Sequence, residues 1–168
     1  GMLMFAAASA KGSARTHYLW AFAMTMFLVG TILATLLSSV GPILYDHFYP
    51  GERFAGLVPA LKASPHNEHV LHYSAYLLAS YNSGQPHFGT GISAMPSMHV
   101  AIAVLNAWYL SRLNRWLGVL GWIFAGIIFF GSVYTGWPYA IAGYVSLLVV
   151  TSIWWICHYA LRRNGEAA

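Results

Sequence analysis

Residues 95–99 read Met-Pro-Ser-Met-His, and they place a hydroxyl and an imidazole at the predicted start of an apolar helix. A proline suits the first position of a helix, because its backbone angle is fixed and it has no N–H to satisfy. With Pro96 there, the free N–H groups of Ser97, Met98 and His99 would point outward together and attract an anion. An imidazole exchanges protons near neutral pH, so His99 could protonate a leaving oxygen. The segment predicts phosphoryl transfer. The same residues are also compatible with an ordinary helix start that is followed by a buried histidine.

Composition decides the class of protein in which this segment lies. The chain has 168 residues, of which 58% are hydrophobic and 7% are charged, and these proportions exclude a soluble domain. A membrane-spanning helix needs about 20 mostly apolar residues. We therefore predict an all-α fold, a polytopic membrane helix bundle that forms a single domain over residues 1–168, with four spans at about 18–40, 95–113, 116–134 and 139–161.

Positive charges near the span ends predict the orientation, because Lys and Arg concentrate on the cytoplasmic side of a membrane. The flanking residues Lys11, Arg15, Arg112, Arg115, Arg162 and Arg163 all favour the same side. We expect both termini in the cytoplasm and the outer segment 41–94 outside, in a plasma membrane, or in the inner membrane if the source is bacterial. Because these charges are spread between the span ends, they argue against binding of nucleic acid.

The outer segment, residues 41–94, contains two predicted interfacial helices. Pro65 can open a helix that runs to about Asn82 with its polar residues near the start. The stretch Gly51–Lys62 predicts a shorter helix that is broken at Pro59. Glycines and prolines then form an irregular loop, and such backbone at membrane depth must line a cavity or be buried in protein. The sequence therefore predicts a recessed pocket that faces outside.

Two side-chain patterns within the predicted spans are typical of membrane helices. Aromatic residues near the predicted surfaces form a belt, which consists of Tyr18, Trp20, Trp116, Trp137, Tyr139, Trp154 and Trp155. Small residues along the third span predict close helix packing, either within the bundle or with a partner protein, and these are Gly118, Gly121, Ala125, Gly126 and Gly131.

Two segments of the chain resemble a known family. Gly91–Val100 and, about thirty residues later, Ser132–Gly143 are similar to motifs of the type 2 phosphatidic acid phosphatase superfamily, and of its inositol phosphorylceramide synthase-like branch in particular. The resemblance covers about residues 15–160. It implies a helical membrane protein with an active site at the outer helix ends, where the charge pattern independently places both segments.

The resemblance also implies a role for individual residues. In the family the Pro-Ser-x-His segment binds phosphate and its histidine is the general acid, which matches Ser97 and His99. A second histidine attacks phosphorus to form a phosphohistidine, and an aspartate four positions later orients it. The matching positions hold Pro138 and Ala142, so the resemblance implies a lost nucleophile and hydrolysis near background. The candidate phosphate-binding residues are Ser97, Met98, Ser93 and Gly136, and no metal or cofactor is expected.

Other departures from the family pattern leave alternatives open. Gly131 and Ser132 stand where many members have a serine and a phosphate-binding arginine, and the first family motif has no counterpart. The family usually has six spanning helices, whereas four are predicted here. The chain is then a fragment, a short natural member or an altered sequence, and helix partners or an oligomer would replace the missing N-terminal helices. The loss of the histidine and aspartate is either natural, as in a pseudoenzyme, or engineered.

Three other interpretations are compatible with the same residues, beside a lipid phosphatase or phosphotransferase. One is a non-catalytic membrane protein that binds a phosphate-bearing lipid or a protein partner. Another is a haem-binding membrane protein with His17 and His158 as the iron ligands near the inner surface. The last is a metal site in the outer segment, formed by two of His66, His69 and His72 with Asp46 or Glu52.

Overall fold

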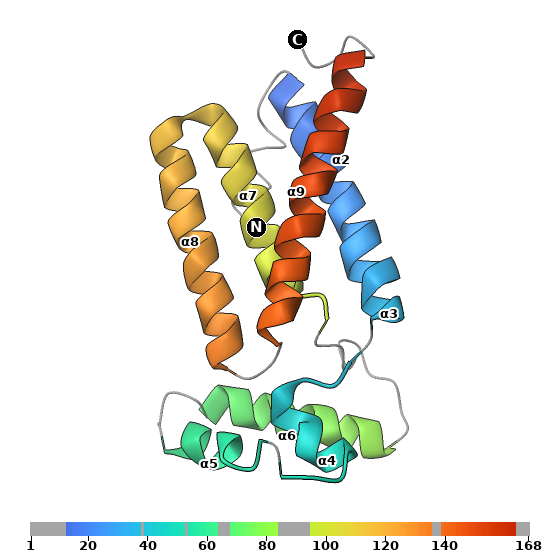
Figure 1. The fold of residues 1–168 in the computed structure, drawn as a ribbon, viewed down its shortest axis with the longest axis vertical. Helices are drawn as coiled ribbons and strands as arrows, with labels where there is room; N and C mark the ends of the chain where they lie inside the picture. Colours follow the sequence, from blue (N-terminus) through green and yellow to red (C-terminus); the bar gives the residue numbers. More distant parts are fainter. Residues whose placement is uncertain are drawn as a thin grey trace.

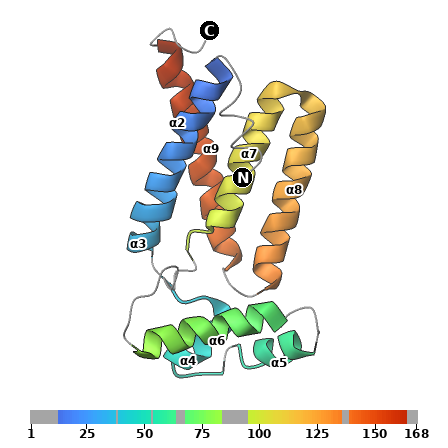
Figure 2. The same ribbon diagram turned by 180° about the vertical axis from the view of Figure 1, so that it is seen from behind.

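The computed structural model describes residues 13–37, 39–52, 54–63, 68–83, 95–135 and 139–163. Every regular element in these segments is a helix. Four rods stand side by side in a bundle, and three further helices form a layer across one end of it (Figure 1). Figure 2 shows the same two layers from behind. The predicted all-α bundle is thereby confirmed.

Three rods of the described chain are long and apolar enough to cross a membrane. The first consists of α2, the π-helix η1 and α3, the second is α8, and the third is α9. Their bounds are Ser13–Phe27 for α2, Leu28–Leu33 for η1, Ala34–Leu36 for α3, Arg115–Tyr134 for α8 and Ala140–Arg163 for α9. By length and composition these rods make the chain an integral membrane protein.

The fourth rod, α7 (Met98–Leu113), is shorter than the predicted span. Its 16 residues rise about 24 Å, whereas a helix needs about 20 residues to cross the hydrocarbon core. The prediction of a start at residue 95 was wrong, because the helix begins only at Met98. α7 contacts α2, α8 and α9, and seven of its side chains are buried. It is therefore the central helix of the bundle, packed mainly against protein.

A buried tyrosine joins the first rod to α7. Tyr18 is 1% exposed, and its hydroxyl donates a hydrogen bond of 2.8 Å to Oδ1 of Asn106. Its ring lies 4.6 Å from that of Tyr109. The prediction that Tyr18 and Trp154 belong to a surface belt was wrong, because both are buried in the bundle. The belt prediction fits the exposed Trp20, Trp116 and Trp155, and Trp137 lies outside the described residues.

Small residues allow α7 and α8 to approach each other closely. A Cβ atom added at Gly118 would lie 2.7 Å from the backbone Cα of Ser111, and one at Gly121 would lie 2.9 Å from the Cα of Ala107. Such distances leave no space for a side chain. At Gly126, in contrast, an added Cβ meets no atom within 4 Å. The small-residue pattern of α8 is thus used within the bundle at Gly118 and Gly121.

We expect Gly118→Ala to lower the free energy of unfolding by about 1–3 kcal/mol, because its methyl group forces the backbones of α7 and α8 apart. Gly126→Ala on the same helix is the matched control, and it should cause no loss, since alanine is the better helix former and the position is open. The measurement is SDS titration of both variants in mixed micelles. Equal losses in the two variants would contradict the close packing of α7 and α8.

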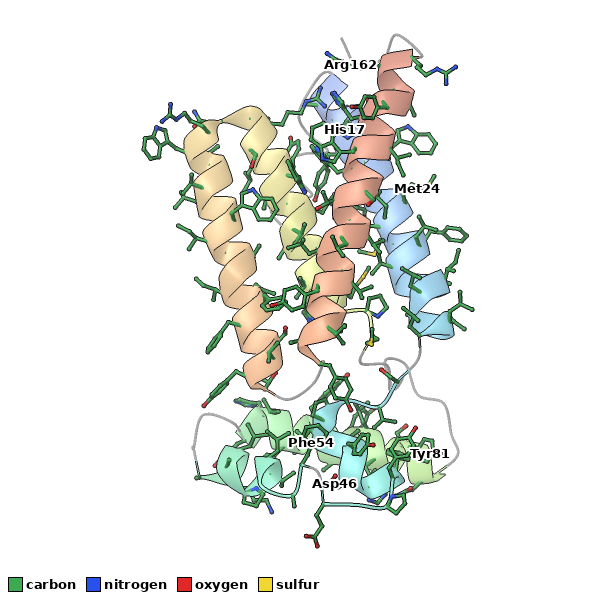
Figure 3. The ribbon with its side chains drawn as sticks, in the orientation of Figure 1. His17, Met24, Asp46, Phe54, Tyr81 and Arg162 are labelled. Carbon is green, nitrogen blue, oxygen red and sulfur yellow. The ribbon has the colours of Figure 1, made fainter. Side chains whose placement is uncertain are left out.

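The layer at the end of the bundle consists of α4 (Pro42–Phe48), α5 (Leu57–Lys62) and α6 (Glu68–Ser83). It has a small core of its own around Ile43, Leu44 and Leu61. The carboxylate of Asp46 accepts a hydrogen bond of 3.0 Å from the backbone N–H of Phe54, and the two residues are labelled in Figure 3. The predicted helix ending near residue 82 is confirmed, whereas α4 was not foreseen.

One detail of the layer contradicts the sequence prediction. α5 is not broken at Pro59, which lies at its third position. The first four N–H groups of a helix have no partner within the helix, so a proline there costs no hydrogen bond. Pro65 and the predicted irregular loop before residue 95 lie outside the described residues.

Candidate functional site

Ser97 connects the start of α7 to the start of α9. Its backbone N–H donates to the carbonyl oxygen of Ala142 at 3.4 Å. Its own carbonyl accepts a hydrogen bond of 2.9 Å from the Ser146 hydroxyl, which also lies 2.9 Å from the Ala142 oxygen. Ser97 is 6% exposed, and Ala142 and Ser146 are fully buried. The two segments that carry the predicted motifs therefore meet at one end of the bundle.

The geometry of this junction corrects the prediction for Pro96. Pro96 is buried and lies before the helix, and Ser97 is the N-cap residue with an extended backbone. The Ser97 N–H is directed to Ala142, so it does not point outward with its neighbours. In the first turn of α7 the N–H groups of Met98 and His99 have no partner within the helix. The anion site predicted from three N–H groups is thus reduced to two.

Met98 and His99 differ in their surroundings. The methyl group of Met98 lies against η1, where a Cβ added at Gly30 would be 3.0 Å from Met98 Cε. The imidazole of His99 is exposed on the first turn of α7. A π-helix within an α-helical rod is often found at functional sites. The structure thus brings η1, the start of α7 and the start of α9 together.

Three predicted site positions, Ser93, Gly136 and Pro138, lie outside the described residues. Of the pair that would carry the nucleophile and its partner, only Ala142 is described. Ala142 is buried, and its carbonyl oxygen accepts from the Ser97 N–H, so residue 142 lies at the junction of the two helices.

A family model described as the PAP2 superfamily matches residues 1–156. The chain belongs to the PAP2 superfamily. No curated protein and no solved structure matches it significantly. Membership of the PAP2 superfamily confirms the family predicted from the two motifs, and it indicates a function connected with lipid phosphates.

Sequence reasoning missed Ser146 as a residue of this PAP2 junction. The sequence does indicate such a role for Ser146, because a polar side chain inside a spanning helix usually forms a hydrogen bond with another part of the protein. Ser146 also stands four positions after Ala142 and thus on the same helix face. Its single hydroxyl proton is shared between two carbonyl oxygens on different helices, so its role is to position the two helix starts.

Ser146→Ala is expected to lower the free energy of unfolding by about 1 kcal/mol, since the buried hydroxyl that bridges the carbonyl oxygens of Ser97 and Ala142 is lost. Ser152→Ala is the matched control, because the Ser152 hydroxyl is exposed and donates only within α9, to Leu148. We expect the control to change stability by less than about 0.5 kcal/mol. Thermal unfolding in detergent checks both variants, and a control as damaging as Ser146→Ala would show that the inter-helix bond contributes nothing.

The metal and haem interpretations find no support among the described residues of this PAP2 chain, and His66 lies outside them. Among the described residues no three His, Cys, Asp or Glu side chains come close enough to hold a metal, and His69 and His72 are exposed on α6. His17 and His158 are neighbours, with ring centroids 5.5 Å apart. Both ring nitrogens of His17 are already engaged, by the Trp154 carbonyl and by Arg112. An iron ligand needs a free ring nitrogen, so this pair does not fit a haem.

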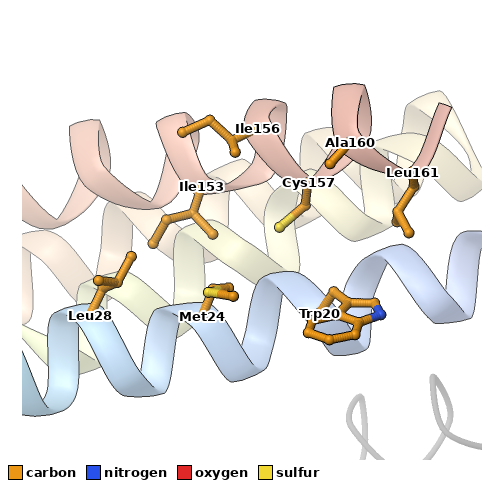
Figure 4. A pocket seen from close by; sticks show the side chains of 8 residues that line it. All are labelled: Trp20, Met24, Leu28, Ile153, Ile156, Cys157, Ala160 and Leu161. Atoms are coloured by element: carbon orange, nitrogen blue, oxygen red, sulfur yellow. The ribbon is translucent and has the colours of Figure 1, made fainter. Parts of the chain in front are cut away.

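A pocket of about 470 Å³ lies between the first rod and α9 (Figure 4). Its lining is almost entirely apolar, with Trp20, Met24 and Leu28 on one side and Ile153 and Cys157 on the other. The lining contains no charged side chain that could bind a phosphate. The pocket is consistent with a rod surface that faces lipid, and it is separate from the junction of α7 and α9.

Proposed function

We propose that this chain binds the phosphate group of a membrane lipid where the starts of α7 and α9 meet, with His99 in the position of the general acid. The reaction ascribed to this site is transfer of a lipid phosphoryl group, or of a phosphoryl headgroup, through a histidine nucleophile and without a metal. The inositol phosphorylceramide synthase-like branch is the part of the superfamily to which we assign the chain. In its present form the chain should release phosphate only near background.

The observation that carries this proposal is the hydrogen bond from the Ser97 N–H to the Ala142 oxygen. It joins the segment with the phosphate-binding residue to the segment with the nucleophile position, although the two are 45 residues apart in the chain. α7 and α9 also begin at this same end of the bundle (Figure 1). Two helix N-termini that point to one place both favour an anion there.

The chemistry at this site follows from what each residue can donate or accept. The N–H groups at the start of α7 would bind phosphate oxygens, and His99 would protonate the leaving oxygen as its bond to phosphorus breaks. The new bond to phosphorus needs a nucleophile with a lone pair, and the nitrogen of Pro138 is an amide. Ala142 has no group that could orient a histidine. Binding is therefore retained in this proposal, and attack on phosphorus is lost.

The proposed orientation places the site outside the cytoplasm. Basic residues of the described rods lie at the opposite end of the bundle from Ser97. They include Arg112, Arg115 and Arg162, the last of which is labelled in Figure 3. Such residues mark the cytoplasmic side. The layer of α4, α5 and α6 would then cover the outer end, next to the site, where the rings of Phe54 and Tyr139 lie 6.2 Å apart.

The test of the proposed function is to install the missing pair, with Pro138→His and Ala142→Asp, and to measure phosphate release from phosphatidic acid. Activity that appears with the pair and depends on His99 supports the assignment. For the alternative of a protein-binding surface on α8, Gly118, Gly121 and Ala125 are not available, because they are buried within the bundle, whereas Gly126 and Gly131 are open.

A further inference from the structure

A second polar pocket lies at the opposite end of the bundle from the proposed site. It has a volume of about 350 Å³ and opens between α7 and α9, with α2 behind it. Four of the side chains that line it can carry positive charge, namely His17, Arg112, His158 and Arg162. Figure 3 shows His17 and Arg162 at this end and Asp46 at the other.

A buried histidine fixes the central arginine of this pocket. His17 is fully buried, and its Nε2 lies 2.9 Å from the carbonyl oxygen of Trp154, so Nε2 carries a proton and donates it. Its Nδ1 lies 2.6 Å from Nη1 of Arg112 and must therefore accept from the guanidinium. His17 thus holds Arg112 through a neutral acceptor. The charge of Arg112 is oriented by this contact, and no carboxylate among the described residues compensates it.

The described residues supply no carboxylate at this end of the bundle. The acidic residues Asp46, Glu52 and Glu68 all belong to the segment that contains α4, α5 and α6, at the far end. Arg112 is half-buried and Arg162 is exposed at the rim. Partly buried guanidinium groups without a carboxylate are suited to bind an anion, and their planar forks match phosphate oxygens.

Aromatic residues place this pocket at the level of lipid headgroups. Trp155 lines the pocket and is 44% exposed, and its ring lies 5.9 Å from that of His158. Nearby, the guanidinium of Arg115 lies 5.2 Å from the centre of the exposed Trp116 ring. Tryptophan and arginine at helix ends are typical of the membrane–water interface. A ligand in the pocket would therefore lie where lipid phosphates lie.

From this geometry we infer that the pocket binds the phosphate diester of an anionic phospholipid. Arg112 and Arg162 bind the phosphate oxygens, and the apolar faces of Trp108 and Trp155 contact the glycerol region. The volume holds a headgroup, and the acyl chains lie along the apolar outer surface of the bundle. This site is separate from the one at Ser97 and His99, and it requires no reaction. A basic pocket between spanning helices on the cytoplasmic side meets the leaflet that is rich in anionic lipid.

The test uses the purified full chain in a neutral detergent, titrated with dihexanoyl phosphatidylglycerol, with tryptophan fluorescence as the readout. Arg112→Gln is expected to weaken binding about tenfold, because a charge-assisted hydrogen bond is lost. Arg115→Gln is the matched control, since Arg115 lies at the same end and outside the pocket lining, and it should change the affinity less than about twofold. Arg162→Gln and Arg163→Gln form a second matched pair on the exposed end of α9, for the case that Arg112→Gln does not fold.

Two further titrations separate the sources of the phosphate. Inorganic phosphate and zwitterionic dihexanoyl phosphatidylcholine should both bind more weakly than phosphatidylglycerol. Inorganic phosphate that binds as tightly as phosphatidylglycerol would overturn the assignment to a lipid, and equal binding of phosphatidylcholine would overturn the need for net charge. If both arginines of each matched pair lost the same affinity for phosphatidylglycerol, the lipid would be attracted by the general positive charge of this end, and the proposed site would be overturned. His72→Ala should leave the affinity unchanged, because His72 is exposed on α6 and belongs to neither site.

Discussion

Replacing Pro138 by His and Ala142 by Asp is expected to raise phosphate release from phosphatidic acid vesicles by at least about a hundredfold over the unmodified chain. The histidine supplies the attacking lone pair, and the carboxylate four positions later fixes its tautomer and stabilises its charge. Ala142 already lies buried against Ser97, so the carboxylate would be placed at the junction of the two helices. Release of inorganic phosphate with time is the measurement.

The controls for this gain are variants within the same background. Pro138→His alone and Ala142→Asp alone should each give less activity than the pair. Adding His99→Ala to the pair should remove most of the gain, whereas His72→Ala, an exposed position on α6, should leave it intact. Phosphate release by the unmodified chain that is insensitive to His99→Ala would contradict the site assignment.

Tyr18→Ala is expected to lower the free energy of unfolding by about 3–5 kcal/mol. The substitution removes a ring that is 1% exposed and opens a cavity between the first rod and α7. It also leaves Asn106 without its 2.8 Å hydrogen bond. Tyr18→Phe keeps the ring and should cost only about 0.6–1.7 kcal/mol, which isolates the hydrogen bond. SDS titration in mixed micelles measures both variants.

Tyr159→Ala is the matched control for the loss of a tyrosine ring. Tyr159 is 62% exposed on α9, so its removal opens no cavity. We expect a change of less than about 0.5 kcal/mol. A loss at Tyr159 equal to that at Tyr18 would contradict the buried contact between the first rod and α7.

The sequence predicted the helical bundle and the meeting of the two motif segments, because both depend on strong local signals. Long apolar runs specify spans, and a Pro-Ser-x-His segment specifies a helix start. Proline prefers the first position of a helix, and this preference predicts a start near Pro96. α7 begins only at Met98. In the structure, the tertiary contact between Ser97 and Ala142 takes precedence over that local preference.

Burial within the bundle was harder to predict than the spans themselves. Tyr18 stands near a predicted membrane surface, and only its hydrogen bond to Asn106 on α7 reveals why it is buried. His17 and His158 are neighbours at one end of the bundle, as predicted. Their proximity alone does not reveal which groups their ring nitrogens contact. The arginine that engages His17 lies 95 residues away, and no local pattern connects the two. Side-chain partners between distant helices therefore require coordinates.

The connection between the two motif segments uses peptide groups and the Ser146 hydroxyl, and these do not depend on the side chains at positions 138 and 142. Exchanging those side chains therefore removes none of these hydrogen bonds. The proposed chemistry and the assembly of this end of the bundle thus depend on different atoms, the first on the side chains at positions 138 and 142 and the second on peptide groups and one hydroxyl.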